Sequence, residues 1–172
     1  MSSNIVNIND YAINLNSGAN ALVNSANDNI IGSSSICFAT TTSQYADVAE
    51  MYAADYNYTP GTVVVFGGFQ EVTASNQSHD IRIAGVISTN PAHLMNSMLT
   101  AEHTVAVALL GRVPCQVTGP VNAGDRMVAS DIPGVAEALD IARYQPGSII
   151  GKALENYSGS GIGTIEIVVG RL

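Results

Sequence analysis

Short runs of β-branched and apolar residues, each entered through a turn glycine, constrain the fold of this chain more than any other feature. The sequence reads PGTVVVF at 60–66, AGDRMV at 123–128 and PGSIIGKAL at 146–154. Glycine suits turns that need a positive backbone angle, and β-branched residues suit strands. The recurrence is too irregular for a solenoid. It predicts a mainly β fold, a small barrel or sandwich of short antiparallel strands.

The remaining strands are expected between polar or glycine-rich loops. Residues 62–66 and 69–74 are expected to form a hairpin around Gly67-Gly68. Further strands are expected at 81–87, 104–110, 112–118 and 165–169. The Gly159–Gly163 run looks like a phosphate loop, but a strand follows it, so no helix N-terminus is available for an anion. We expect it to be a hairpin turn.

The first 43 residues differ in composition from the rest. They contain nine Asn residues, and Asp10 and Asp28 are their only charged side chains. Residues 13–16 alternate apolar and polar, as a half-buried strand does. The segment has too few large apolar side chains to fold alone, so we expect its own body or neighbouring copies to stabilise it, the alternative being a disordered tail. The chain is thus divided into an Asn-rich N-terminal arm, residues 1–43, and a β-rich body, residues 44–172.

Composition excludes several classes of protein. Of 172 residues, 47% are apolar and only 12% charged, against about 25% charged in average soluble proteins. The excess of apolar residues indicates burial between chains as well as within one. The net charge is 6 − 14 = −8 and the six cations form no cluster, so nucleic-acid binding is not expected. No run is long enough for a membrane-spanning helix, and no signal peptide precedes the chain, so we expect a soluble protein without membrane insertion.

Two cysteines, Cys37 and Cys115, lie far apart in the sequence. They could form a disulfide, but two buried free thiols are the favoured interpretation, because a free Cys behaves as a small hydrophobe. Three histidines and two carboxylates could be considered as metal ligands: His79, His93, His103, Asp80 and Glu102. Their spacing matches no ligand motif, so they are interpreted as loop residues, and no metal or cofactor is expected.

The acidic stretch 44–56 has helical spacing, with apolar or aromatic residues at 45, 48, 49 and 52. In a helix, Asp47 and Glu50 would lie side by side, with Asp55 one turn further on. Such a pair suits acid–base chemistry or a calcium site, but it is equally typical of the start of a helix. Four tyrosines, at 45, 52, 56 and 58, could form a patch for glycan or protein contact, or pack in a core or interface.

A series of segments follows in a defined order from Tyr45 to Leu172. They read ADVAEMYAADYNYTPGTVVVFGG, EVT, IRIAGVISTNPAHLMNS, VAVALLGRVPCQVTGPVNAGDRMVAS, PGSIIGKALE and GTIEIVVGRL. In order and spacing they resemble the C-terminal domain of tail-fibre-like virion proteins of tailed bacteriophages. Those proteins carry an ADLAE-type segment, a PGTVV turn, an AGVVSTNPA segment, a GRVPC strand and a GKALE segment.

The resemblance implies a symmetric, commonly homotrimeric protein on the surface of a phage particle. Residues 1–43 would then dock on the capsid or tail, or intertwine with sister chains. Typical fibres carry a long stalk before this domain, whereas this chain starts with Met shortly before it. A short fibre or spike, a capsid decoration protein or an adaptor is therefore expected, located in the virion and without enzymatic activity.

Two alternatives remain. One is a receptor- or glycan-binding module at a tail tip. The other rests on a more distant resemblance of ADVAEMY and AGVISTNP to the autoproteolytic C-terminal domains of phage neck-appendage and tailspike proteins. That resemblance implies a self-cleaving assembly domain in which Asp47 and Glu50 take part.

Overall fold

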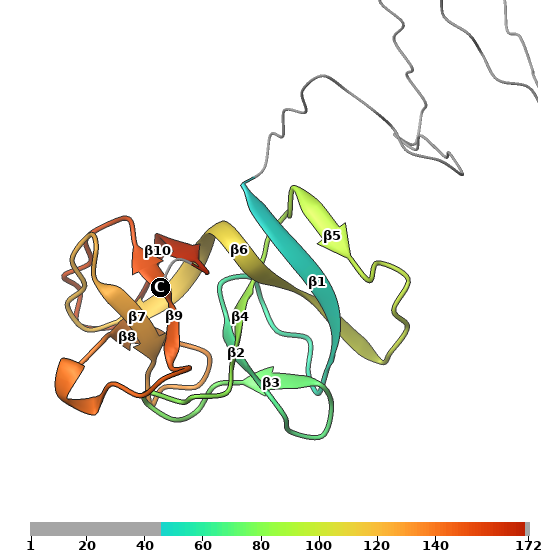
Figure 1. Cartoon of the computed structure of the whole chain (residues 1–172), viewed down its shortest axis with the longest axis horizontal. Helices are drawn as coiled ribbons and strands as arrows, with labels where there is room; N and C mark the ends of the chain where they lie inside the picture. Colours follow the sequence, from blue (N-terminus) through green and yellow to red (C-terminus); the bar gives the residue numbers. More distant parts are fainter. Residues whose placement is uncertain (1–45, 171–172) are drawn as a thin grey trace, which may run out of the picture. The chain divides into compact units, whose positions relative to one another are not determined.

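The computed structural model describes residues 46–170, whose regular secondary structure is nearly all strand, because their backbone groups pair along the recurring β-branched runs (Figure 1). The strands are β1 Asp47–Ala54, β2 Val63–Phe66, β3 Val72–Ala74, β4 Ile83–Ile87, β5 His93–Met95, β6 His103–Thr118, β7 Arg126–Ala129, β8 Ala136–Ala138, β9 Ile149–Ala153 and β10 Ile162–Val169. One 3-10 turn, η1 Ile141–Arg143, is the only helical element in this part of the chain. The prediction of a mainly β body of antiparallel strands is confirmed.

The long strand β6 organises the sheet. Its first half pairs antiparallel with β1, from His103 to Gly111, and its second half pairs antiparallel with β10, from Gly111 to Thr118. β6 also pairs with β4 and with β8. Two closed circuits of strands therefore share β6: one runs through β4, β2, β3 and β1, and the other through β8, β7, β9 and β10. Three pairings are parallel: β1 with β3, β1 with β5, and β6 with β8.

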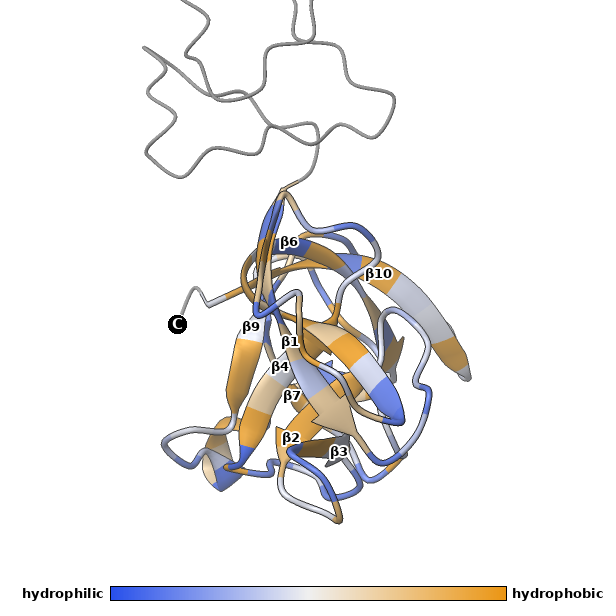
Figure 2. Cartoon of the chain, turned by 90° about the vertical axis from the view of Figure 1, so that its right-hand side faces the viewer, coloured by the Kyte–Doolittle hydropathy of each residue, from blue (hydrophilic) through white to orange (hydrophobic). Residues whose placement is uncertain are grey.

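Each circuit encloses apolar side chains. In the second half of β6, Val113, Cys115 and Val117 are buried while the residues between them are half-buried, as the two-residue period of a strand requires. They pack with residues such as Met127 and Ile167 in the larger core cluster. The smaller cluster contains Val64, Val72, Ile87, Val105, Val107 and Ala54. Figure 2 shows the resulting alternation of hydrophobic and hydrophilic residues along the strands.

The helix expected over residues 44–56 is wrong, because residues 47–54 form strand β1. All eight residues of β1 pair with β6. Their backbone N–H and C=O groups therefore form hydrogen bonds across the sheet in place of the hydrogen bonds of a helix. Helix propensity is a weak prior that such tertiary pairing overrides. The strands expected at 104–110 and 112–118 are joined into one, since Gly111 continues the pairing at φ 111°.

Several predictions concern residues outside the described range. The strand at residues 13–16, the arm at residues 1–43, Cys37 and Tyr45 all belong to this group. In the described range, no helix is long and apolar enough to cross a membrane. The hairpin of β2 and β3 is confirmed, with Gly67 and Gly68 at positive φ in its turn.

Candidate functional site

The two β1 carboxylates do not form a pair. Asp47 and Glu50 are three residues apart on a strand, so their side chains leave opposite faces. Asp47 is buried, and its Oδ2 has no hydrogen-bond partner among the described residues. Glu50 instead accepts a hydrogen bond from the Tyr52 hydroxyl at 2.9 Å. Burial of the Tyr52 phenol, and then its bond to Glu50, raises the pKa of Tyr52 to about 12.

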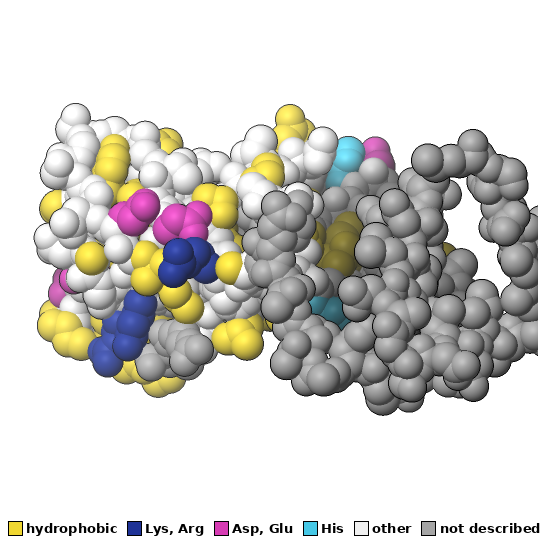
Figure 3. All heavy atoms as spheres, turned by 90° about the horizontal axis from the view of Figure 1, so that it is seen from above, with side chains coloured by type: hydrophobic (Ala, Val, Ile, Leu, Met, Phe, Trp, Pro, Cys, Tyr) yellow, Lys and Arg dark blue, Asp and Glu magenta, His cyan; other side chains and the backbone are white. Residues whose placement is uncertain are grey.

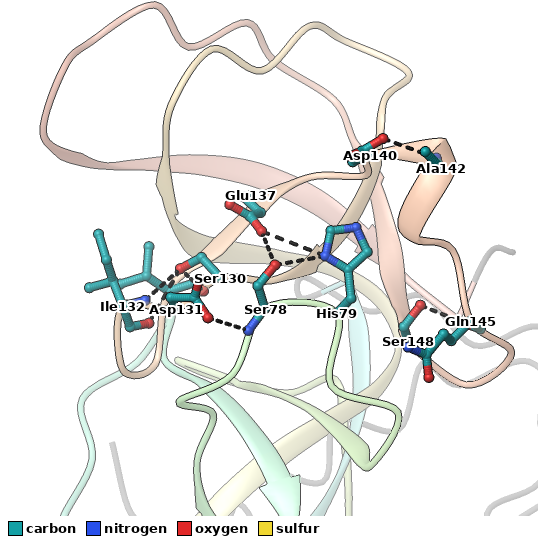
Figure 4. A network of polar contacts seen from close by, with 11 residues as sticks. Ser78, His79, Ser130, Asp131, Ile132, Glu137, Asp140, Ala142, Gln145 and Ser148 are labelled. Atoms are coloured by element: carbon teal, nitrogen blue, oxygen red, sulfur yellow. Dashed lines mark hydrogen bonds and ion pairs between the residues drawn. The ribbon is translucent and has the colours of Figure 1, made fainter.

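The most connected polar cluster lies elsewhere, between the 76–80 loop and strands β7 and β8 (Figure 4). Ser78 Oγ lies 2.7 Å from His79 Nδ1 and donates to Glu137 Oε1 at 2.5 Å. The Ser78 backbone N–H donates to Asp131 Oδ1 at 2.9 Å. His79 Nδ1 lies 3.7 Å from Glu137 Oε1. The cluster thus ties the loop to the segment that follows β7 and to β8.

The arrangement of this cluster differs from that of a catalytic triad. Ser78 and His79 are both buried. The single Ser78 proton goes to Glu137, so the hydroxyl is left to accept from Nδ1–H of His79. In a Ser–His–acid triad, by contrast, the acid and the serine contact different ring nitrogens. His79 Nε2 has no hydrogen-bond partner in the described part of the chain.

His79 also has an unusual backbone. Its φ is 61°, a left-handed conformation that costs a non-glycine residue about 1–3 kcal/mol. Its N–H donates to Ala129 O at 2.9 Å, which holds the turn in place. His79 lies in a loop, as its sequence context predicts, whereas nothing in the sequence singles out Ser78, Asp131 or Glu137. No sequence signal could have done so, because the side-chain bonds join residues 53 and 59 positions apart.

The other candidate metal ligands are dispersed. His93 lies on the exposed strand β5, and His103 begins β6, where its ring lies 6.2 Å from that of Tyr56. Asp80 is paired with Arg82, whose Nη2 lies 2.6 Å from Oδ2. Among residues 46–170 there is no group of three or more His, Cys, Asp or Glu that could hold a metal ion. Cys115 is a free, fully buried thiol, and burial raises its pKa to about 12.

The surface carries few charges and several large apolar side chains. Seen from above, basic and acidic side chains lie next to one another amid hydrophobic and uncharged groups (Figure 3). Phe69 is 97% exposed in the turn between β2 and β3, and Tyr56 is 65% exposed after β1. A hollow of about 410 Å³ lies beside β9 and β10, lined by Ala123, Gly124, Lys152, Ala153, Leu154 and Val168. Exposed apolar side chains on a surface with few charges suit contact with another macromolecule.

No protein-family model matches the sequence, and no curated protein matches it. Among solved structures, the chain is similar to the pre-mature gene product 12 of bacteriophage phi29, with a TM-score of 0.59 and 15% identity over 80% of this chain and 23% of that chain. The N base of head fiber gp8.5 of bacteriophage phi29 was also found, with a TM-score of 0.42 and 12% identity over 72% of this chain and 93% of that one. The chain thus spans less than a quarter of gene product 12. The first similarity shows that this fold occurs within a phage protein.

Proposed function

We propose that this chain is a structural protein of a tailed-bacteriophage virion. In this proposal it forms a short fibre or spike, a capsid decoration or an adaptor, and it assembles as a symmetric homo-oligomer, a homotrimer. The observation that carries the proposal is the similarity of the fold to phi29 gene product 12 over 80% of the chain. The motif order from Tyr45 to Leu172 resembles phage virion proteins independently of that comparison.

The surface supports an assembled state. Phe69 and Met98 are 97% and 90% exposed, and the chain carries only 12% charged residues. Exposed apolar side chains on a charge-poor surface gain stability when a partner removes them from water. Residues 1–43 are the proposed attachment arm to the capsid or tail. Each copy would bind modestly, and the closed assembly would multiply that affinity through effective concentration.

Two measurements test the proposal. Light scattering on the purified chain is expected to give a multiple of the 17.8 kDa chain mass at micromolar concentration, and a monomer would contradict the assembly. Electron-density reconstruction of the whole virion is expected to place the protein on the particle surface. Its absence from purified particles would contradict the structural role.

A receptor- or glycan-binding module is the second candidate, and the exposed aromatic residues favour it. Phe69 and Tyr56 stand in turns where an aromatic face can stack on a sugar or a protein. Binding of the intact protein to a glycan array, lost in Phe69→Ala or Tyr56→Ala, would support this role. If the assembled protein gives no signal on the array, the glycan-binding role is contradicted and only the structural role remains.

A further inference from the structure

Phe69 is the most exposed large hydrophobic side chain of residues 46–170, at 97%. It follows Gly67 and Gly68, both at positive φ, in the turn that joins β2 to β3. A ring so exposed contributes almost nothing to the core of its own chain. Aromatic residues, Phe among them, are enriched at protein–protein interfaces relative to the rest of the surface.

A hollow lined mostly by small and apolar residues lies beside β9 and β10. Its volume is about 410 Å³, and all but one of its lining residues are Ala, Gly, Leu or Val. A closed apolar cavity of about 150 Å³ holds a benzene-sized ring, and this larger hollow is open to solvent, so a ring can enter it from outside. Figure 1 places β3 in the right-hand part and β9 and β10 in the left-hand part. The β2–β3 turn, which carries Phe69, and the strands beside the hollow thus lie in different parts of the described body.

The charges around the two surfaces are complementary. Lys152 lines the hollow, and Arg126 lies directly opposite Lys152 in the β7–β9 pair. Like charges opposite one another are unfavourable in a sheet, and the two ion pairs found in the described residues include neither of them. Asp125 lies beside them, but its Oδ2 is bonded to the Asn122 backbone N–H at 2.8 Å. An acidic partner would relieve the repulsion.

The Phe69 turn supplies that acidity. Glu71 follows Phe69 by two residues, and Asp55 Oδ2 lies 3.4 Å from the position a Cβ would take at Gly68. Glu71 Oε2 accepts from the Ala53 backbone N–H at 2.8 Å, and Asp55 Oδ1 accepts from the Tyr58 hydroxyl at 2.6 Å. Each carboxylate keeps its charge and its other oxygen for a partner. The cation nearest this turn is Arg82, which is engaged with Asp80. The turn therefore presents an aromatic ring with carboxylates beside it.

We infer that Phe69 of one copy inserts into the Ala123–Leu154–Val168 hollow of a neighbouring copy, with Glu71 and Asp55 facing Lys152 and Arg126. Because the two surfaces differ, the contact is head-to-tail, and each copy gives one ring and receives one. Closure of such contacts forms a cyclic oligomer. This inference rests on the proposed homo-oligomer and names its interface.

The test uses light scattering on the full chain with substitutions on each side of the contact. Phe69→Ser removes the ring, and Ala123→Trp fills the hollow from an exposed position. Each is expected to weaken assembly by about tenfold or more, with an unchanged circular dichroism spectrum. Ile141→Ser is the matched control, since Ile141 is 71% exposed on η1 and outside the contact. It is expected to assemble as the unmodified chain does.

Charge reversal provides an independent test of the same contact. Lys152→Glu and Glu71→Lys are each expected to weaken assembly, and the double substitution is expected to restore it in part. If Phe69→Ser and Ala123→Trp both assemble normally while the unmodified chain is an oligomer, this interface is wrong and the proposed function stands. If the unmodified chain is a monomer, the proposed homo-oligomer itself is wrong.

Discussion

At the scale of single residues, the contact between Arg82 and Asp80 is the shorter of the two ion pairs among residues 46–170. Arg82 Nε and Nη2 donate to the two Asp80 carboxylate oxygens at 3.0 and 2.6 Å, and Asp80 is buried. The side-chain bond to Arg82 lowers the pKa of Asp80 below its ordinary 3.8, against the effect of burial, which raises it. A carboxyl with a lowered folded-state pKa contributes stability above its unfolded pKa, and that contribution is lost as the pH falls through the folded value.

The first prediction follows from the lowered pKa of Asp80. Arg82→Gln is expected to lower the free energy of unfolding at pH 7 by about 1–2 kcal/mol, a range reduced because the Arg82 side chain is half exposed. The difference between variant and unmodified chain should shrink at pH 3, measured by urea denaturation at both pH values. Arg143→Gln, on η1, is the control and should change stability by less than about 0.5 kcal/mol. An equal loss at both pH values would contradict the role of Asp80.

The second prediction concerns Cys115. Only the thiolate reacts with thiol reagents, and burial raises the pKa of Cys115 to about 12. In a Cys37→Ser variant, which leaves one cysteine, labelling of the folded protein at pH 8 should be at least about a hundredfold slower than in denaturant. Mass spectrometry over time gives both rates. Rapid labelling of the folded chain would show that Cys115 is not in a closed core.

At the scale of elements, the sequence predicts a strand well where a glycine turn lies next to a run of β-branched residues. The β2–β3 hairpin, β4 and β9 follow from glycine turns and β-branched runs that lie within a few residues of each other. Strand β1 could not be predicted, because its strand form depends on pairing with β6, about 60 residues later. The Ser78–His79–Glu137 cluster was hidden for the same reason, since contacts far apart in sequence leave no local pattern.

The third prediction concerns Gly111, where the two halves of β6 meet. A Cβ at this position would lie 2.2 Å from Ala46 O and 2.8 Å from Asp47 Cα, and φ is 111°. Gly111→Ala is therefore expected to lower the free energy of unfolding by about 3 kcal/mol or more, because β1 must move and the backbone is strained. Thermal unfolding followed by circular dichroism measures the change.

Gly161→Ala is the matched control for Gly111→Ala. Gly161 precedes β10, a Cβ there would meet nothing within 4 Å, and its φ lies outside the left-handed region. Its replacement should leave the midpoint of unfolding nearly unchanged. Similar losses for the two variants would mean that β1 does not pack against β6 at Gly111 as described.

At the scale of the whole molecule, the proposals place assembly and attachment in different parts of the chain. The head-to-tail contact that we infer lies within residues 46–170, whereas the proposed attachment arm is residues 1–43. A chain that attaches through one arm per copy gains affinity when copies are joined, because the second and third arms bind from a high effective concentration. Loss of assembly should therefore weaken attachment, and loss of the arm should abolish it.

The fourth prediction distinguishes loss of assembly from loss of the arm. Attachment is measured by cosedimentation with particles that lack the protein. Deletion of residues 2–43 is expected to preserve the β-type circular dichroism spectrum and to abolish attachment, because the body keeps its sheet but loses the proposed contact. Phe69→Ser keeps the arm and is expected to attach at least about tenfold more weakly than the unmodified chain, since single arms bind without avidity. Ile141→Ser should attach normally. If the truncated chain still decorates particles, the arm assignment is wrong, and the attachment surface must lie on the β-body itself.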